Sequence, residues 1–126
     1  MFEIDLKSRK SIYQQVIDNF KELIITGIIT DDEKLPSVRD LAKVLTINPR
    51  TIQKAYQELE RQNYVYMVSG KGTFATPGKD REIDEKQVRE TESRLRELIR
   101  ELKFLGYDKK KTRELMEKLL KEAEEK

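Results

Sequence analysis

Apolar residues recur at helical spacing in the first half of the chain, and capping residues mark where each apolar stripe starts. A first helix is predicted to begin at Ser11, with Gln14 completing a capping box, and to end at Gly27. A second is predicted to begin at Ser37, a favourable N-cap, with Asp40 at the positive end of the helix. The predicted inward faces are Ile12, Val16, Phe20, Leu23 and Ile24 in the first helix, and Val38, Leu41, Ala42 and Leu45 in the second.

The sequence Thr-Ile-Asn-Pro-Arg-Thr at residues 46–51 interrupts this pattern, and helical spacing resumes directly after it. Asn48 is a favourable N-cap, and Pro49 suits the first helical position, where a missing N–H costs nothing. We therefore predict a turn at residues 46–47 and a third helix from about Pro49 to Gln62. Its inward face is Ile52, Ala55, Tyr56 and Leu59. Two short helices joined by a tight turn form a helix-turn-helix, whose second helix enters the major groove of DNA.

Apolar and polar residues alternate in two further places, as they do in β-strands. Residues 2–6 predict a short N-terminal strand, and residues 63–76 predict two strands joined around residues 69–72. A hairpin directly after the second helix of a helix-turn-helix is a wing. Its glycines permit positive φ angles and a close approach to a phosphate backbone, and Lys71 supplies positive charge at the tip.

Two amphipathic helices are predicted in the C-terminal part of the chain. Asp84 with Gln87 caps the first, Gly106 ends it, and Asp108 caps the second. Their apolar stripes are Val88, Leu95, Leu98, Ile99, Leu102 and Leu105 in the first, and Leu115, Met116, Leu119 and Leu120 in the second. Each stripe is too narrow to stabilise an isolated helix. We therefore predict an antiparallel hairpin that needs a partner surface, most simply a second copy of the chain.

Charge divides the chain near the sequence Thr-Pro-Gly-Lys-Asp at residues 76–80. Residues 1–78 hold 21 charged residues, whereas the 48 residues of 79–126 hold 29. We predict a winged helix-turn-helix domain over residues 1–78 and a two-helix dimerisation tail over residues 79–126. The fold class is mainly α with a small β wing, which makes it α+β.

The composition excludes several kinds of chemistry. There is no cysteine and no histidine, so disulfides and thiol nucleophiles are excluded, and the commonest general base and metal ligand is missing. We expect no metal, no cofactor and no enzymatic activity, since the carboxylates mostly belong to helical charge patterns. The net charge of +2 says little about partners. No apolar run approaches the length of a membrane span, so we expect a cytoplasmic protein without membrane contact.

Three motifs give the chain a family resemblance. The sequences Leu-Pro-Ser-Val-Arg (35–39), Asn-Pro-Arg-Thr (48–51) and Gly-Lys-Gly-Thr-Phe (70–74) resemble, in order and spacing, the winged helix-turn-helix of bacterial GntR-family transcription factors. The short tail resembles that of the YtrA-like subfamily. The resemblance implies a homodimeric repressor on a palindromic operator, controlling an ABC-transporter operon or a stress-response operon. The chain departs from the family pattern at Asp32 and Thr46, where glycine is common.

Candidate DNA-binding residues follow from the motif and from the resemblance. They are Ser37, Arg39, Asn48, Arg50, Thr51, Gln53, Lys54, Gly70, Lys71 and Gly72. A cation at Arg50 opposes the dipole at a helix start, which points to an external anion. Several of these residues also have a simpler interpretation: Arg39 could bridge to Asp40 or be solvated, Thr51 and Gln53 could be surface residues without a contact, and Lys54 and Lys71 could be solvated lysines. Gln53 stands where some relatives carry arginine, so the operator sequence cannot be transferred from them.

Candidate dimerisation residues are Leu95, Leu98, Ile99, Leu102, Leu105, Leu115, Met116 and Leu119. The expected partners are a double-stranded DNA operator and a second copy of the chain. A small-molecule inducer of unknown identity could bind between the tail helices or at the dimer interface. The alternative hypothesis is a protein-interaction module that uses the winged helix and the charged hairpin as a scaffold. That alternative predicts little affinity for DNA.

Overall fold

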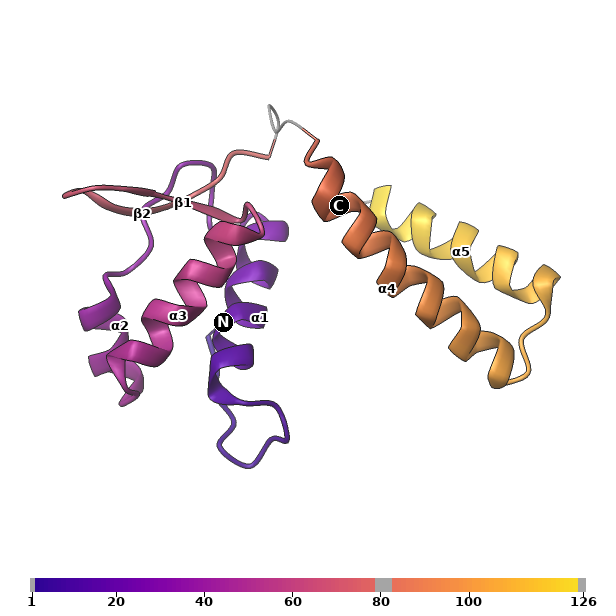
Figure 1. Ribbon diagram of the computed structural model, residues 1–126, viewed down its shortest axis with the longest axis horizontal. Helices are drawn as coiled ribbons and strands as arrows, with labels where there is room; N and C mark the ends of the chain where they lie inside the picture. The colour runs from indigo at the N-terminus through magenta and orange to yellow at the C-terminus, as the bar shows by residue number, and fades with distance from the viewer. Residues whose placement is uncertain (1, 79–82, 125–126) are drawn as a thin grey trace. The chain divides into compact units, whose positions relative to one another are not determined.

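The computed structural model describes residues 2–78 and 83–124, and the chain divides into two compact units, residues 1–81 and 82–126. The first unit contains the helices α1 (Ile12–Ile25), α2 (Val38–Leu45) and α3 (Pro49–Arg61), then an antiparallel hairpin of β1 (Val65–Val68) and β2 (Gly72–Ala75). The second unit contains α4 (Glu85–Phe104) and α5 (Lys109–Glu124), which form a helical hairpin (Figure 1). The predicted fold class is confirmed.

The predicted domain boundary lies after residue 78 and adjoins residues 79–82. Lys79 and Asp80 of the predicted linker lie outside the described ranges. The assignment of residues 1–78 to DNA binding and of residues 79–126 to dimerisation therefore stays a prediction. None of the helices in the described ranges has the length and the apolar character that crossing a lipid bilayer requires.

The first helix starts and ends at the predicted residues, but its capping box is incomplete. The Ser11 hydroxyl oxygen accepts the backbone N–H of Gln14 at 3.1 Å. A complete capping box requires the Gln14 side chain to bond to the backbone of Ser11. Instead, Gln14 Nε2 donates to Asp18 Oδ1 at 2.9 Å. Lys10 also donates to this carboxylate, at 2.9 Å. Burial alone would raise the pKa of Asp18, but these two hydrogen bonds lower the pKa on balance.

The predicted N-terminal strand is wrong, because residues 2–5 belong to no strand, residue 6 lies in a turn, and no strand pairing within the described ranges involves them. Their backbone groups bond to two amide side chains of α1 instead. Asp5 donates its N–H to Gln15 Oε1 at 2.7 Å, and Gln15 Nε2 donates to the Asp5 carbonyl at 2.9 Å. Asn19 Nδ2 donates to the Glu3 carbonyl at 3.0 Å. A primary amide offers the same donor and acceptor as a peptide group, so it replaces a neighbouring strand.

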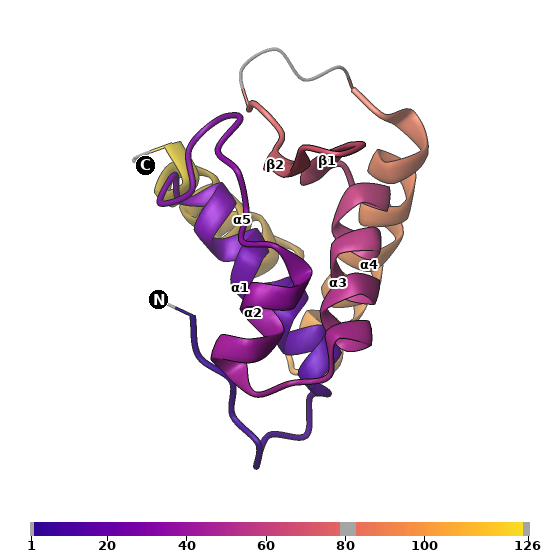
Figure 2. The same cartoon turned by 90° about the vertical axis from the view of Figure 1, so that its left-hand side faces the viewer.

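The core of the first unit is formed by α1, α2, α3 and the hairpin, which lie around it in Figure 2. The predicted inward face of α3 is confirmed, because Ile52, Ala55, Tyr56 and Leu59 are all at most 1% exposed. Phe20 of α1 packs edge-on against Tyr56, with ring centroids 5.5 Å apart. The prediction for α1 omitted Ile17, which is also fully buried.

Tyr56 ties α3 to the segment that precedes α2. Its hydroxyl donates to the Pro36 carbonyl at 2.8 Å, and its ring is 1% exposed. This bond fixes the start of α2 relative to the middle of α3. Burial raises the pKa of Tyr56 above the ordinary tyrosine value of 10.0.

Replacing Tyr56 by phenylalanine is expected to lower the free energy of unfolding by about 1–2 kcal/mol, since the Pro36 carbonyl loses its buried donor.

The raised pKa of Tyr56 also predicts how stability changes with pH. Since the unfolded chain releases the tyrosine proton first, the contribution of Tyr56 to stability is present below pH 10.0 and is lost as pH rises above it. Urea unfolding at pH 7 and pH 10.5 measures both effects. A wild type and a Tyr56→Phe variant that lose equal stability between these pH values would contradict the second.

Asp32 and Thr46, which stand where glycine is common in the family pattern, both have positive φ angles. Thr46, the C-cap of α2, has φ 57° and ψ 50°, and Asp32 has φ 61°. A β-branched residue is uncommon in this left-handed region. Asp32 gains a compensating contact, because its Oδ1 accepts the Tyr66 hydroxyl at 2.7 Å.

Thr46→Gly is expected to stabilise the first unit by up to about 1 kcal/mol, because the left-handed strain exceeds the extra entropy of glycine in the unfolded chain. Asp32→Gly is the matched control: it relieves a similar backbone strain but removes the bond to Tyr66, so it is expected to give no gain. The midpoint of urea unfolding measures both variants. A loss of stability in Thr46→Gly would show that the threonine side chain, not the backbone, determines this position.

The second unit is an open hairpin with its predicted caps in place. Asp84 accepts the N–H of Gln87 at 3.2 Å, Gly106 has φ 98°, and Asp108 accepts the N–H of Lys111 at 2.8 Å. No residue of α4, and none of the described part of α5, is buried. Leu102, Leu115 and Met116 are half-buried, whereas the other predicted dimerisation residues are exposed: Leu95, Leu98, Ile99, Leu105 and Leu119.

Candidate nucleic-acid interface

Side-chain caps determine the residues at which the two helices of the helix-turn-helix begin. The Ser37 hydroxyl oxygen accepts the N–H of Asp40 at 3.1 Å and begins α2. Asn48 Oδ1 accepts the N–H of Arg50 at 2.9 Å and begins α3, with Pro49 in the first turn. The Ser37 hydroxyl hydrogen remains able to donate to an external acceptor. The predicted turn chemistry at residues 46–49 is confirmed.

The predicted contact residues at these helix starts are accessible. Arg39, Arg50, Gln53 and Lys54 are exposed, and Thr51 is half-buried. Within the described ranges, the side chains of Arg39, Arg50 and Lys54 make no hydrogen bond or ion pair. The alternative in which Arg39 bridges to Asp40 is therefore not what the structure holds. Cations left without an internal partner suit an external anion.

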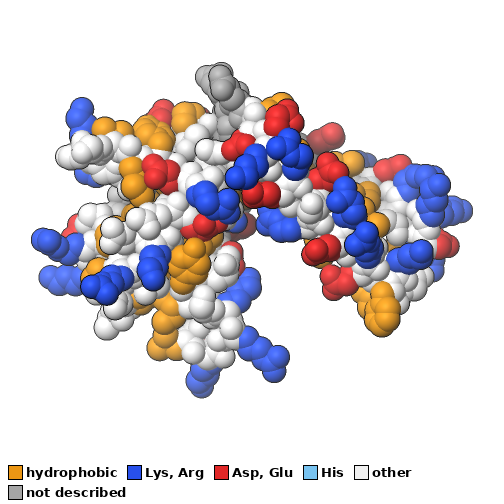
Figure 3. Space-filling model, viewed as in Figure 1, with side chains coloured by type: hydrophobic (Ala, Val, Ile, Leu, Met, Phe, Trp, Pro, Cys, Tyr) orange, Lys and Arg blue, Asp and Glu red, His pale blue; other side chains and the backbone are white. Residues whose placement is uncertain are grey.

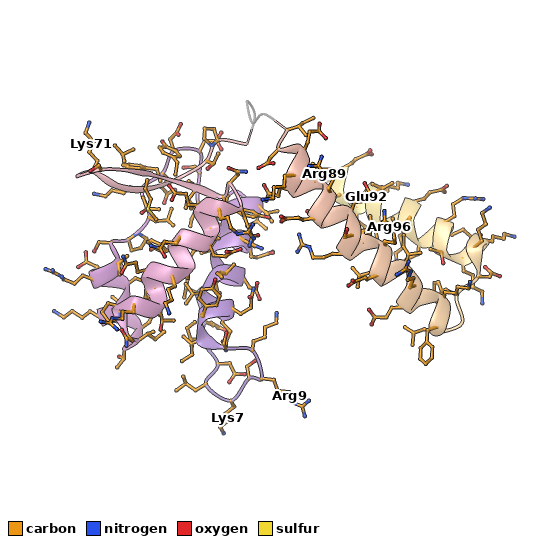
Figure 4. The ribbon with its side chains drawn as sticks, in the orientation of Figure 1. Lys7, Arg9, Lys71, Arg89, Glu92 and Arg96 are labelled. Carbon is orange, nitrogen blue, oxygen red and sulfur yellow. The ribbon has the colours of Figure 1, made fainter. Side chains whose placement is uncertain are left out.

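The hairpin presents a third cation at its tip. Lys71 lies at the far end of the turn between β1 and β2, pointing away from the helices (Figure 4). Its N–H donates to the Val68 carbonyl at 2.9 Å and closes the turn. Gly70 has φ 76° with open space around its α-carbon, so only its backbone conformation requires glycine there.

Gly72 has φ 129°, so its backbone conformation favours glycine, as the sequence predicts for the hairpin. A β-carbon at this position would lie 2.8 Å from Cε of Lys34, which crosses it. The close neighbour within the chain is therefore a lysine stem, and the expected approach to a phosphate backbone stays a prediction. Lys34 belongs to the loop before α2 and forms an isolated antiparallel bridge with Phe74 of β2.

Lys34 is a cation at the wing that the sequence interpretation missed. The loop before α2 lies along β2 as a short third partner, since Leu35 donates to the Thr73 carbonyl at 2.8 Å and Ala75 donates to the Glu33 carbonyl at 2.8 Å. The polar sequence of residues 30–34 carries no strand signal. Only the pairing with β2 brings Lys34 to the hairpin.

These segments form one charged surface of the first unit. In Figure 3, Lys and Arg side chains gather along the left-hand edge of this unit, over α2, the start of α3 and the hairpin. The surface combines helix starts, which carry partial positive charge, with cations on three separate segments. It suits a polyanion better than a single small anion. A further exposed pair, Lys7 and Arg9, lies in the segment before α1 (Figure 4).

A helix-turn-helix followed by a β-hairpin, with exposed cations at both helix starts and at the hairpin tip, defines a winged helix-turn-helix DNA-binding protein. The chain belongs to the gntR family of bacterial regulatory proteins, whose family model matches residues 12–75. It is therefore a transcriptional regulator with a DNA-binding winged helix, as the resemblance implied.

The similarity to one relative extends over both units. The chain is 34% identical over 119 residues to the HTH-type transcriptional repressor YtrA of Bacillus subtilis, and the aligned region covers 94% of this chain and 92% of that protein. The structure is similar to that of a transcriptional antiterminator from Listeria monocytogenes, with a TM-score of 0.81 and 36% identity over 98% of this chain and 92% of the other. The predicted YtrA-like subfamily is confirmed.

A third comparison concerns DNA. The DNA-binding domain of AraR, solved in complex with the operator ORE1, matches with a TM-score of 0.52 and 29% identity, over 60% of this chain and 93% of that domain. This similarity covers only a winged-helix portion, so it concerns the first unit and carries nothing about the tail.

Proposed function

We propose that this chain is a cytoplasmic, homodimeric repressor that binds a palindromic operator and blocks transcription. Each protomer contributes one recognition helix, α3, to a major groove, and one wing to the flanking backbone. The observation that carries this proposal is the set of exposed cations at the two helix starts that have no partner among the described residues, of which Arg39 and Arg50 are the central pair.

Within this proposal the contact residues divide into two groups. Arg50, Thr51 and Gln53 sit in the first turns of α3, from which side chains reach base edges. The residues that bind and orient the phosphate backbone are Ser37, Arg39, Asn48, Lys54, Gly70, Lys71 and Gly72. Lys34 joins this second group, because its side chain lies over Gly72 in the wing.

The proposed dimer forms through the tail. Its apolar residues are too exposed for a helical hairpin that stays alone in water: Leu98 is 56% exposed and Leu105 is 70% exposed. A second copy placed against the same faces would bury them in a four-helix arrangement. The spacing of the two operator half-sites would then follow the geometry of this dimer.

The alternative, a protein-interaction module, uses the same exposed tail with a different partner. It predicts little DNA affinity and a complex with another protein. The proposed target, an operon for an ABC transporter or a stress response, rests on the YtrA-like resemblance. A reporter fused to such an operon's upstream region would test it, with higher expression expected when the gene for this chain is deleted.

The first test is fluorescence anisotropy with DNA from immediately upstream of the protein's own operon, against scrambled DNA of equal length. Tight binding that favours the native fragment is expected. Affinity should fall steeply with salt, because a dimer that neutralises about 6 to 8 phosphates releases a similar number of counterions. Weak binding that is equal on both DNAs, combined with a hetero-complex in pull-downs, would favour the interaction module.

A further inference from the structure

The tail hairpin contains a groove that shares only Ile99 and Met116 with the proposed dimerisation residues. It lies between α4 and α5 near their connecting turn, and it has a volume of about 690 Å³. That volume is within the range of small-molecule sites, which are about 300–1,000 Å³. Its apolar surface comes from Ile99 of α4, Tyr107 of the turn and Met116 of α5. Such a surface suits the hydrocarbon or aromatic body of a small molecule.

The rim of this groove is cationic. Residues 79–126 hold 15 Lys and Arg and 14 Asp and Glu, a nearly even balance. The groove nevertheless collects four of the cations and one carboxylate: Arg100, Lys103, Lys109, Arg113 and Asp108. Within the described ranges, none of the four cations has an ion-pair partner. The single carboxylate, Asp108, caps α5 by accepting the N–H of Lys111 at 2.8 Å, and it leaves an excess of three positive charges in the lining.

The groove and the proposed dimer face lie on different sides of α4. An α-helix has 3.6 residues per turn, so Arg100 lies about 200° around the axis from Leu98. Lys103 lies about 100° from Leu102 by the same geometry. The leucines can therefore face a second copy while the cations line the groove. Ile99 lies between these two directions on α4, and Ile99 and Met116 belong to both sets of residues.

We propose that this groove binds a small amphipathic anion, with a carboxylate, sulfonate or phosphate group held by the rim and an apolar body held by the floor. An apolar molecule alone would leave four cations without a counter-charge, and an inorganic anion would leave the apolar floor in water. A ligand with both parts satisfies both surfaces. The tail then has a second role beside dimerisation, and the inference does not depend on operator binding.

The test is isothermal titration calorimetry of the full-length protein with decanoate below its critical micelle concentration. Saturable binding of one decanoate per chain is expected. Two control ligands should each bind at least about tenfold more weakly than decanoate. Decylammonium has the same chain and the opposite charge, and butyrate has the same head group and a short chain. Equal affinity for decanoate and decylammonium would overturn the proposal, because the cationic rim would then play no part.

A pair of variants locates the site. Arg100→Glu with Arg113→Glu is expected to weaken decanoate binding about tenfold, because two favourable ion pairs become repulsive. Arg89→Glu with Arg94→Glu changes the net charge of the tail equally but outside the groove (Arg89 is labelled in Figure 4), and should bind like the wild type. Circular dichroism checks that both remain helical. The milder pair Arg100→Gln with Arg113→Gln replaces the first if it unfolds.

Two results would remove the assignment. Equal losses in the groove pair and the control pair would mean that decanoate responds to the overall charge of the tail. Dissociation of the protein by decanoate, seen by light scattering, together with unchanged decanoate affinity in the groove pair, would mean that the ligand occupies the apolar dimer face and not the groove.

Discussion

A chain that ends at residue 78 is expected to be a folded monomer that binds its operator about 100-fold more weakly than the full-length protein. The first unit keeps its own core, so its fold does not need the tail. Linking two recognition helices makes the second binding event intramolecular, and its loss removes the gain in avidity. Light scattering measures the mass, and fluorescence anisotropy on the full palindrome measures the affinity.

Two comparisons separate loss of dimerisation from other effects of truncation. On DNA that contains a single half-site, the truncated and the full-length chains should bind about equally, since avidity needs two half-sites. In the full-length chain, Leu98→Glu with Leu105→Glu should reproduce the truncation, whereas Arg89→Glu, on an already charged part of α4, should not. A truncated chain that remains dimeric would remove the tail from the dimer interface.

The helices could be predicted because their ends are marked locally. Ser11, Ser37, Asn48, Asp84 and Asp108 each act as the cap that the sequence suggested. A cap and an apolar stripe depend on residues at most four positions apart, so one sequence contains the whole signal.

The errors share a different cause, which is pairing between distant segments. The backbone of residues 2–6 is satisfied by Gln15 and Asn19, and an amide side chain that replaces a strand has no periodic pattern. Lys34 reaches the wing because its loop pairs with β2, about 40 residues later in the chain. Gly72 accommodates that lysine, and its neighbours in the sequence do not show this.

The missing glycines show what a family pattern adds to the physical interpretation. The resemblance noted that glycine is common at the positions of Asp32 and Thr46, and both residues have positive φ. The family preference therefore has a backbone origin here. The chain keeps the conformation with two other residues, and only Asp32 has a side-chain bond that offsets the strain.

Arg50→Ala is expected to lower the affinity for the specific operator by about 100-fold or more, while changing the affinity for scrambled DNA only slightly. A bidentate contact from arginine to a base contributes about 1–3 kcal/mol of discrimination, and the proposed dimer makes it twice. Because the Arg50 side chain has no partner among the described residues, its removal leaves no internal group unpaired. The fold and its stability should therefore stay the same, which circular dichroism and urea unfolding can check.

Lys54→Ala is the matched control, because Lys54 is an exposed cation on the same helix, one turn further from its start. If Lys54 binds phosphate, its loss should weaken binding to both DNAs by a similar factor and lower the slope of affinity against salt by about one counterion per site. Anisotropy titrations of both variants on both DNAs, over a salt series, give the four comparisons needed. Equal losses on operator and scrambled DNA in Arg50→Ala would place Arg50 with Lys54 on the backbone, and base reading would then fall to Thr51 and Gln53.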